Sequence, residues 1–500
     1  MDYSSLQNGS DIRGVAMEGV AGQEVNLTEQ ACRDIGRGFA LWLRGRLGKD
    51  DLRVAVGRDS RLTGPALARW IGEARAAEGV AVTDMGMAST PAMFMATVTE
   101  GFRFDGAVMV TASHLPFNRN GYKFFTGQGG LEKQDIKAIL TLAASDGHTG
   151  LPAAARSEGS FMPVYADILC RKVREATGCE RPLEGLRIVV DAGNGAGGFY
   201  ATQVLEPLGA DTTGSRFLDP DGTFPNHIPN PENEAAMAAI RSAVLENKAD
   251  LGIIFDTDVD RAGAVLSDGS ELNRNRIIAM MAAILLREHP GTTIVTDSIT
   301  STGLAKFIAA HGGIHHRFKR GYRNVINESI RLNDEGRDSQ MAMETSGHGA
   351  LKENYFLDDG AYLVTRLLME LAKGRREGYT LPSLIADLQE PAESREFRMD
   401  LRLPDFKPYG NDIIDQLRDY AAHRPGWALA PNNYEGVRVD LDGDHGDGWF
   451  LLRMSLHEPL MPLNMESDSA GGVKAIAREL VPFLQRFDKL DTAALAEFAR

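Results

Sequence analysis

Residues 251–261 read Leu-Gly-Ile-Ile-Phe-Asp-Thr-Asp-Val-Asp-Arg. The apolar first half predicts a buried strand, and three carboxylates follow it at alternate positions: Asp256, Asp258 and Asp260. Because α/β folds place ligand sites at the carboxyl ends of strands, these side chains are expected to converge in a loop there. A bound hard cation such as Mg²⁺ is the natural way to offset so much negative charge in one turn. The stretch therefore predicts an α/β fold with a divalent-metal loop.

A second stretch, Thr111-Ala112-Ser113-His114, follows another predicted strand and makes most sense together with the first, as a nucleophilic serine that the metal serves. Taken alone, a serine at a strand end is most often a turn or helix-cap residue. A lone histidine, such as His114 or His348, is by default structural. The acidic loop by itself could be a calcium loop, but an EF-hand needs glycine and glutamate where this chain has Arg261 and Ser267.

The same strand-then-loop pattern recurs along the chain and predicts repeated α/β units. Strands are expected over residues 53–56, 80–83, 107–110, 187–190, 251–255 and 293–295, with a helix over 65–78. Beyond Arg395 the pattern changes to strands over 436–441 and 449–454 and a helix over 471–487, which indicates an α+β domain. We expect four domains, covering residues 1–155, 156–269, 270–390 and 391–500.

Composition narrows the class of protein. Five hundred residues with 43% hydrophobic and 25% charged side chains exceed one core and predict a multidomain globular protein. A formal net charge of −15 argues against a general nucleic-acid or anionic-membrane binder. The three cysteines show no metal or disulfide spacing, and no apolar run is long enough to cross a bilayer. We therefore expect a cytoplasmic protein, monomeric or a small homo-oligomer, without a nucleic-acid or membrane partner.

Five motifs together carry a resemblance to the α-D-phosphohexomutase superfamily, and most of all to its phosphomannomutase/phosphoglucomutase branch, between Ser10 and Glu466. They occur in the family's order. The motifs are Asp11-Ile12-Arg13-Gly14, Thr111-Ala112-Ser113-His114-Leu115-Pro116, Asp256-Thr257-Asp258-Val259-Asp260-Arg261, Glu344-Thr345-Ser346-Gly347-His348 and Arg453-Met454-Ser455-Leu456-His457-Glu458-Pro459.

This resemblance implies an α/β fold of four domains around a central cleft, three of them related α/β domains with mixed sheets and the last a smaller α+β domain. It also implies a phosphohexomutase in which Ser113 is carried as phosphoserine. The enzyme would interconvert 6- and 1-phosphates of mannose or glucose with Mg²⁺, through a hexose 1,6-bisphosphate that also serves as activator.

Residue roles follow from the same resemblance. The implied catalytic group is Ser113, Lys123, Arg13, His114 and Arg261, and the implied metal ligands are Ser113, Asp256, Asp258 and Asp260. Lys123 is the best candidate for general acid/base help. Phosphosugar contacts are implied for Glu344, Ser346, His348, Arg320, Tyr322, Arg453, Ser455 and His457.

Several positions depart from the family's pattern. Leu456 and His457 stand where the terminal phosphate loop usually has Asn and Thr, which removes an amide and a hydroxyl. Tyr322 stands where some bifunctional enzymes of the branch have His, and Thr345 where that group often has Met. The preferred sugar is left open by these changes.

Three alternatives stay open. Phosphoglucosamine mutase is one, although its sugar loop typically carries Gln where Thr345 lies. A phosphatase of the haloacid-dehalogenase type would use Asp256 as nucleophile, but it usually has Thr or Val in place of Asp260 and leaves Ser113 without a role. The two departures in the terminal loop also fit a catalytically weak sugar-phosphate sensor.

Two smaller features receive structural interpretations. We interpret Arg58 and Arg61 as a solvated or interdomain ion-pair face. The glycine-rich residues 193–198 lack the dinucleotide-binding pattern and predict a tight packing turn.

Overall fold

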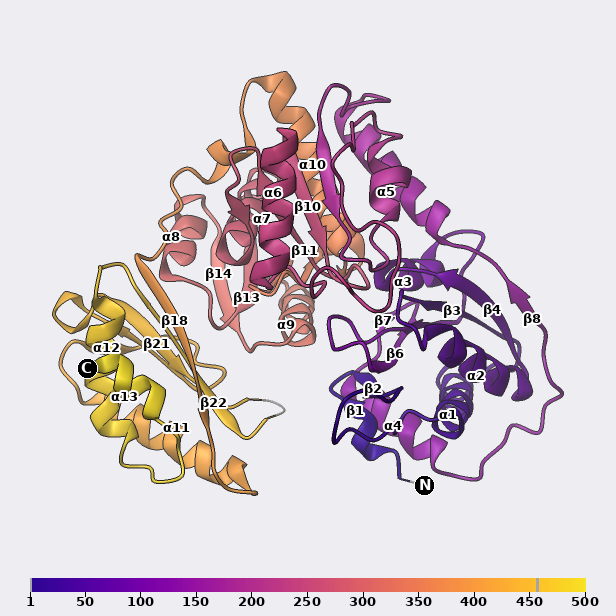
Figure 1. The fold of residues 1–500 in the computed structure, drawn as a ribbon, viewed down its shortest axis with the longest axis horizontal. Helices are drawn as coiled ribbons and strands as arrows, with labels where there is room; N and C mark the ends of the chain where they lie inside the picture. Colours follow the sequence, from indigo (N-terminus) through magenta and orange to yellow (C-terminus); the bar gives the residue numbers. More distant parts are fainter. Residues whose placement is uncertain (1, 456–457) are drawn as a thin grey trace. The chain divides into compact units, whose positions relative to one another are not determined.

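The computed structural model describes residues 2–455 and 458–500, and the chain divides into two compact units. The first unit comprises Met1–Ile277 and Ser346–Ser383, and the second comprises Ile278–Thr345 and Leu384–Arg500. Each unit contains its own sheets and helices (Figure 1).

The first sheet of the first unit is mixed and has the order β1-β2-β6-β5-β3-β4-β8, with β7 beside β6. Its central strand β3 runs parallel to β4 and β5, whereas β6 is antiparallel to β5 and β2. The strands are β1 Gln7–Asn8, β2 Asp11–Val15, β3 Leu52–Arg58, β4 Val80–Met87, β5 Gly106–Val110, β6 Arg119–Thr126, β7 Gly129–Gly130 and β8 Arg156–Glu158. The accompanying helices are α1 Glu29–Leu47, α2 Gly64–Ala77, α3 Thr90–Val98 and α4 Lys133–Ala143.

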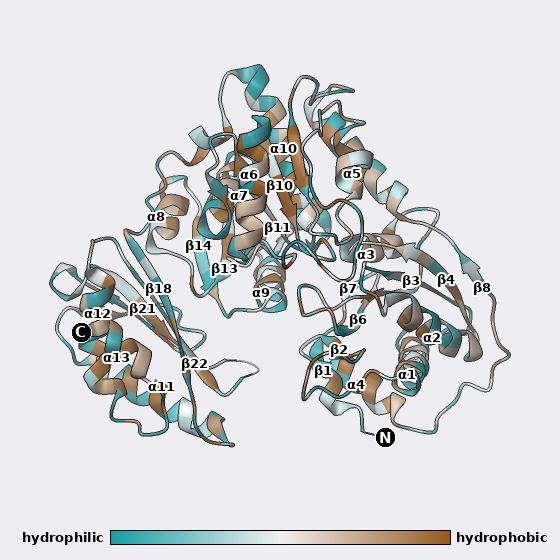
Figure 2. Ribbon diagram, in the orientation of Figure 1, coloured by the Kyte–Doolittle hydropathy of each residue, from teal (hydrophilic) through white to brown (hydrophobic). Residues whose placement is uncertain are grey.

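The second sheet has the order β12-β11-β10-β9, in which β10 is parallel to β9 and antiparallel to β11. All five residues of β10 are buried, and Figure 2 shows the strand in the colour of hydrophobic residues. The strands are β9 Ile188–Asp191, β10 Leu251–Phe255, β11 Ala262–Leu266 and β12 Glu271–Leu272. Its unit also contains α5 Met162–Thr177, a π-helix Tyr200–Leu205, α6 Glu234–Asn247, the hairpin β16 Gly349–Leu351 and β17 Leu357–Asp358, and α10 Gly360–Glu377.

In the second unit β13 lies between β14 and β15 and is parallel to both. These strands are β13 Thr293–Asp297, β14 Ile314–Phe318 and β15 Ser339–Met343, with helices α8 Thr302–Ala310 and α9 Tyr322–Asp334; α7 Arg274–Glu288 leads into them. The C-terminal sheet is antiparallel throughout, in the order β18-β22-β21-β20-β19. Its elements are β18 Glu393–Asp400, α11 Phe406–Ala422, β19 Trp427–Leu429, β20 Val437–Leu441, β21 Gly448–Leu452, β22 Leu460–Ser467, α12 Gly472–Leu484 and α13 Ala493–Ala499.

These sheets confirm the expected fold class, three α/β domains with mixed sheets followed by an α+β domain. The strand expected over residues 251–255 is β10, while the C-terminal strand expected to end at 454 ends at Leu452. Among the described residues no helix has the length and apolar character needed to cross a membrane.

Candidate active site and metal centre

The acidic loop is a tight hairpin between β10 and β11, closed by the pair Phe255 and Ala262. Val259 adopts a left-handed backbone with φ +68° to make the turn. The glycine-rich loop supports it from one side, because the Ala196 N–H donates to the Thr257 carbonyl at 2.8 Å. A Cβ on Gly195 would lie 2.6 Å from that same carbonyl oxygen, so only glycine fits there. Residues 193–198 thus form a packing turn, in agreement with the interpretation from the sequence.

Asp256, Asp258 and Asp260, here called the metal aspartates, are fully buried, and each offers an oxygen within 4.8 Å of the others. Each of them accepts a hydrogen bond on Oδ2 from a residue in the part of the chain that forms the first sheet and its helices. The donors are Ser113 Oγ to Asp256 at 3.0 Å, Thr90 Oγ1 to Asp258 at 2.5 Å and Lys123 Nζ to Asp260 at 2.7 Å.

The carboxylate oxygens that accept no hydrogen bond indicate a cation site. Oδ1 of Asp258 and Oδ1 of Asp260 are buried and accept no hydrogen bond from the described residues. Burial, then the charges of Asp260 and Asp258, raise the pKa of Asp256 well above its usual range. Burial also opposes ionisation of Asp260, yet Lys123, followed by His348 and Arg261, brings its pKa below the usual range. Carboxylate oxygens in this arrangement fit a hard divalent cation, and the chain thus has a buried acidic metal-binding site.

Ser113 follows β5 with a left-handed backbone, φ +50°, and its N–H donates to Thr111 Oγ1 at 2.9 Å. Its hydroxyl donates to Asp256, and the hydroxyl oxygen accepts a hydrogen bond from Arg261 Nη2 at 2.9 Å. The same Arg261 nitrogen lies 2.5 Å from His114 Nδ1. Burial, then the Arg261 cation, lower the pKa of His114 to about 3, so the ring is neutral and Nδ1 accepts.

Sheet order explains how the remaining cations reach this serine. Arg13 lies on β2 opposite Gly121 of β6, and Lys123 lies on β6 opposite Met109 of β5. Arg13 donates to the Thr111 carbonyl and forms an ion pair with Asp11 at 2.8 Å. Lys123 forms ion pairs with Asp260 at 2.7 Å and with Asp11 at 3.8 Å. The structure therefore brings the five catalytic residues implied for the first unit together with the metal aspartates.

The interpretation of Arg58 and Arg61 as a solvated or interdomain ion-pair face is wrong for Arg61 in its solvated form. Its side chain is fully buried, 3.6 Å from the Asp59 carboxylate. The guanidinium donates to the backbone carbonyls of the serine loop, those of Ser113, Leu115, Pro116 and Arg119. The order of the strands could have indicated this contact, because Arg61 follows β3, and β3 pairs with β5, the strand that precedes Ser113.

Residues 346–360 cover the other side of the acidic loop within the first unit. His348 Nδ1 lies 2.6 Å from Asp358 and 3.8 Å from Asp260, and the backbone of His348 bridges to Arg261. Burial acts to lower the pKa of His348, but the Asp358 and Asp260 carboxylates outweigh it and raise the pKa to about 9. His348 and the buried Ser346 therefore lie in a segment that contacts the metal loop, and Asp358 is a residue that sequence reasoning missed.

Within the second unit, residues 344–345 contact the loop of residues 319–321 before α9, directly and through Asp297. Glu344 accepts a hydrogen bond from the Gly321 N–H at 2.6 Å, immediately before Tyr322 begins α9. Asp297, at the end of β13, lies 3.4 Å from the Arg320 guanidinium. It also accepts hydrogen bonds from the hydroxyl and N–H of Thr345, at 2.9 and 3.3 Å. Asp297 holds both loops and is a second residue that sequence reasoning missed.

Only part of the terminal phosphate loop is described. Arg453 follows β21, and its Nε is buried without a hydrogen-bond partner among the described residues. Burial lowers the pKa of Arg453, while the Glu435 carboxylate acts against this. Ser455 Oγ accepts from the Glu458 N–H at 3.3 Å. The predicted contact His457 and its neighbour Leu456 lie outside the described residues.

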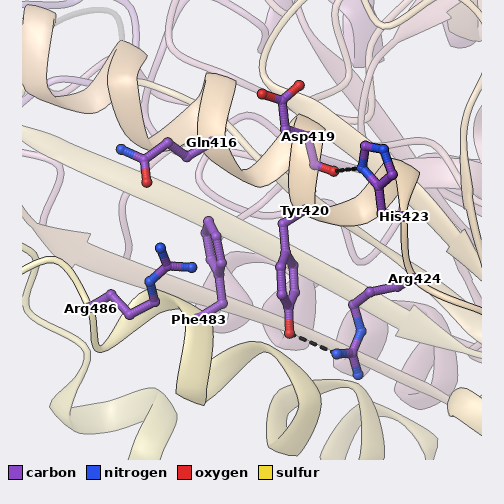
Figure 3. Close-up of a pocket in the computed structure, with 7 residues that line it drawn as sticks. All are labelled: Gln416, Asp419, Tyr420, His423, Arg424, Phe483 and Arg486. Carbon is purple, nitrogen blue, oxygen red and sulfur yellow. Dashed lines mark hydrogen bonds between the residues drawn. The ribbon is translucent and has the colours of Figure 1, made fainter.

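A hollow of about 440 Å³ on the C-terminal domain is not this site. Tyr420 and Phe483, whose stacked rings have centroids 4.7 Å apart, line it, and none of the predicted site residues does (Figure 3). Of its polar groups, Arg424 donates to the Tyr420 hydroxyl at 2.8 Å and to Glu479 at 2.7 Å. The hollow therefore lacks the serine, the acidic loop and the other motif residues that cluster in the site described above.

Comparison with known proteins agrees with this geometry. The family models for phosphoglucomutase/phosphomannomutase alpha/beta/alpha domains I, II and III match residues 5–148, 168–269 and 273–391. A phosphoglucomutase of Neisseria meningitidis serogroup A is 30% identical over 470 residues, 94% of each chain. A phosphomannomutase/phosphoglucomutase of Pseudomonas putida is 32% identical over 445 residues, 87% of this chain and 89% of its own.

The fold agrees as well. The crystal structure of a phosphoglucomutase/phosphomannomutase family protein from Burkholderia thailandensis has 28% sequence identity and a TM-score of 0.78, and the match covers 97% of this chain and 98% of that one. Three matched domains, two relatives at 30% identity or more and the clustered motifs therefore agree: the chain belongs to the phosphoglucomutase/phosphomannomutase family of the α-D-phosphohexomutase superfamily and is a mutase.

Proposed function

We propose that this mutase interconverts hexose 6-phosphates and hexose 1-phosphates of mannose, glucose or both, through phosphoserine at position 113 and a hexose 1,6-bisphosphate. One observation carries the proposal: Ser113 Oγ lies 3.0 Å from Asp256 and 2.9 Å from Arg261, and Asp256 belongs to a cluster in which two buried carboxylate oxygens accept no hydrogen bond from the described residues. The printed names of the relatives, phosphoglucomutase and phosphomannomutase/phosphoglucomutase, support both sugars as substrates.

Mg²⁺ held by the metal aspartates and by the phosphate on Ser113 would neutralise charge on the phosphoryl group. Around it, Arg261 and Arg13 supply fixed positive charge next to the serine loop. In the first transfer the bond from Ser113 Oγ to phosphorus breaks, a sugar oxygen bonds to phosphorus, and the sugar hydroxyl loses its proton. In the return transfer the other sugar oxygen–phosphorus bond of the bisphosphate breaks, the bond from Ser113 Oγ to phosphorus forms again, and the leaving sugar oxygen takes up a proton. Lys123, ion-paired to Asp260, is the proposed group that exchanges this proton with the reacting oxygen.

Recognition of the rest of the phosphosugar is proposed for the two remaining motifs. Glu344, Ser346 and His348 are proposed to bind sugar hydroxyls, because they are buried or half-buried polar residues of one motif. The phosphate that is not reacting is proposed to bind the Arg453, Ser455 and His457 loop together with Arg320 and Tyr322. A bisphosphate that turns end for end needs such donors, which grip either phosphate.

We further propose the domain boundaries 1–155, 156–269, 270–390 and 391–500, which the matched ranges support. We propose that the enzyme works in the cytoplasm as a monomer or small homo-oligomer on phosphosugars, without a nucleic-acid or membrane partner.

Mass spectrometry of the purified protein tests the proposal. We expect one phosphate on the peptide that contains Ser113, its loss after incubation with excess hexose phosphate, and no turnover in Ser113→Ala. Ser145→Ala is the matched control, since its exposed hydroxyl contacts only nearby backbone, donating to the Leu142 carbonyl and accepting from the Gly147 N–H. Phosphate on Asp256 instead, or full activity of Ser113→Ala, would falsify the phosphoserine mechanism.

A further inference from the structure

Thr90 belongs to none of the family motifs, yet it holds one of the metal aspartates at two points. Its hydroxyl donates to Asp258 Oδ2 at 2.5 Å, and its backbone N–H donates to the Asp258 carbonyl at 2.8 Å. Thr90 is the first residue of α3 and is 3% exposed. It lies 168 residues before Asp258, in the range matched by domain I, whereas Asp258 lies in the range matched by domain II.

This contact decides which oxygen of Asp258 is left for a ligand. Oδ2 is occupied by the Thr90 hydroxyl, while Oδ1 is buried and accepts no hydrogen bond from the described residues. A carboxylate is free to rotate about its bond to Cβ, so a fixed donor on one oxygen sets the direction of the other. Without the Thr90 hydroxyl, a fully buried side chain would lose the one side-chain donor described for it.

Ser113 and Lys123 contact Asp256 and Asp260 in the same way, each on Oδ2. Asp256 also accepts hydrogen bonds from Arg261. All three metal aspartates therefore accept a hydrogen bond on Oδ2 from the range matched by domain I, each from a different element: the loop after β5, the start of α3 and strand β6. Two of these donors belong to the proposed chemistry. Thr90 lacks a proton to exchange near neutral pH, and its hydroxyl is committed to Asp258, so it remains as a support.

We propose that Thr90 is a positioning residue of the metal centre: it orients Asp258 and thereby raises the affinity of the three aspartates for a divalent cation. The inference rests on the metal site of the proposed function. It makes cation affinity depend on the packing of the matched domain I range against the matched domain II range within the first unit.

The test compares Thr90→Val, which keeps the shape and removes the hydroxyl, with Thr90→Ser, which keeps the hydroxyl. Thr97→Val is the matched control, because Thr97 lies on the same helix, is 6% exposed, and donates only within it, to the Phe94 carbonyl at 2.7 Å. Metal-free, dephosphorylated protein is titrated with Mn²⁺ and Mg²⁺ by calorimetry. Melting curves in chelator show whether each variant is folded.

We expect Thr90→Val to raise the Kd for Mn²⁺ by about 10- to 100-fold, as is usual when a group that orients a metal ligand is removed. At saturating metal, kcat of this variant should change by a smaller factor than the Kd. Thr90→Ser should restore the Kd, and Thr97→Val should leave it unchanged. If Thr90→Val does not fold, Thr90→Cys replaces it, and its weaker donor should give an intermediate Kd.

The outcomes separate the inference from the function on which it rests. Equal Kd values in wild type and Thr90→Val, or in Thr90→Cys and Thr90→Ser, would overturn the role of Thr90 and leave the mutase intact. A wild-type protein that binds neither cation, and that turns over in chelator, would remove the metal site and this inference together.

Discussion

Arg61 provides the sharpest test of how the fold holds the reactive serine. The change is Arg61→Lys, which keeps the positive charge beside Asp59 and removes the planar fork. In the wild type the guanidinium donates to the carbonyls of Ser113 and Leu115 at 2.5 Å, Pro116 at 2.8 Å and Arg119 at 2.9 Å. A single ammonium nitrogen cannot reach four carbonyls spread over this loop.

The size of the effect follows from the hydrogen bonds that lysine is unable to make. If lysine keeps two of the four, two hydrogen bonds to a charged donor disappear, at about 1.5–3 kcal/mol each. Hydration of the freed carbonyls and relaxation of the loop recover part of this, which leaves a destabilisation of about 2–4 kcal/mol. At about 2–4 °C for each kcal/mol in a large domain, Tm should fall by about 4–16 °C. A shift of the loop by about 1 Å would also lower kcat by about 100-fold.

The assay measures Tm, kcat and KM side by side with Arg37→Lys. Arg37 is the matched control, because it too is a buried arginine with an aspartate partner that grips loop carbonyls, those of Ala143, Ser145 and Gly147, at the end of α4. We expect both variants to lose stability and only Arg61→Lys to lose kcat, with KM little changed. A variant Arg61→Lys that melts like Arg37→Lys but turns over like the wild type would refute the role in positioning.

Three further results are expected. Asp258→Asn should abolish turnover and chelator-sensitive Mg²⁺ binding without lowering Tm, because it relieves repulsion among buried carboxylates, and metal titration with a parallel melt checks this. His348 has a pKa of about 9 against an ordinary 6.5, so its stabilisation is complete below pH 6.5 and is lost as pH rises towards 9; in chelator, Tm of the wild type should fall over that window more steeply than Tm of His348→Asn. Arg453→Ala should raise KM for glucose 1-phosphate or mannose 1-phosphate by about tenfold or more, and Leu456→Asn with His457→Thr should lower it by less, as steady-state kinetics will show.

The sequence was sufficient where local pattern decides structure. An all-apolar run bounded by acidic residues predicted β10 with its observed ends, and the order of the motifs predicted that Ser113 and the metal aspartates would meet. It was insufficient where a partner is distant along the chain. Arg61 resembled a solvated ion pair because the carbonyls that it binds begin 52 residues later, and nothing near Thr90 indicates a contact 168 residues away. Such pairs appear only when the order of strands in the sheet is known.

The left-handed backbone of Ser113 has a consequence for laboratory evolution of this protein. A residue with a side chain at φ +50° costs about 1 kcal/mol or more relative to glycine, which adopts that conformation freely. Selection for thermal stability alone would therefore reward glycine at position 113, whose hydroxyl the proposed phosphoserine mechanism requires. Variant libraries of this chain need selection for turnover at every round, because the most heat-resistant clones would include dead ones.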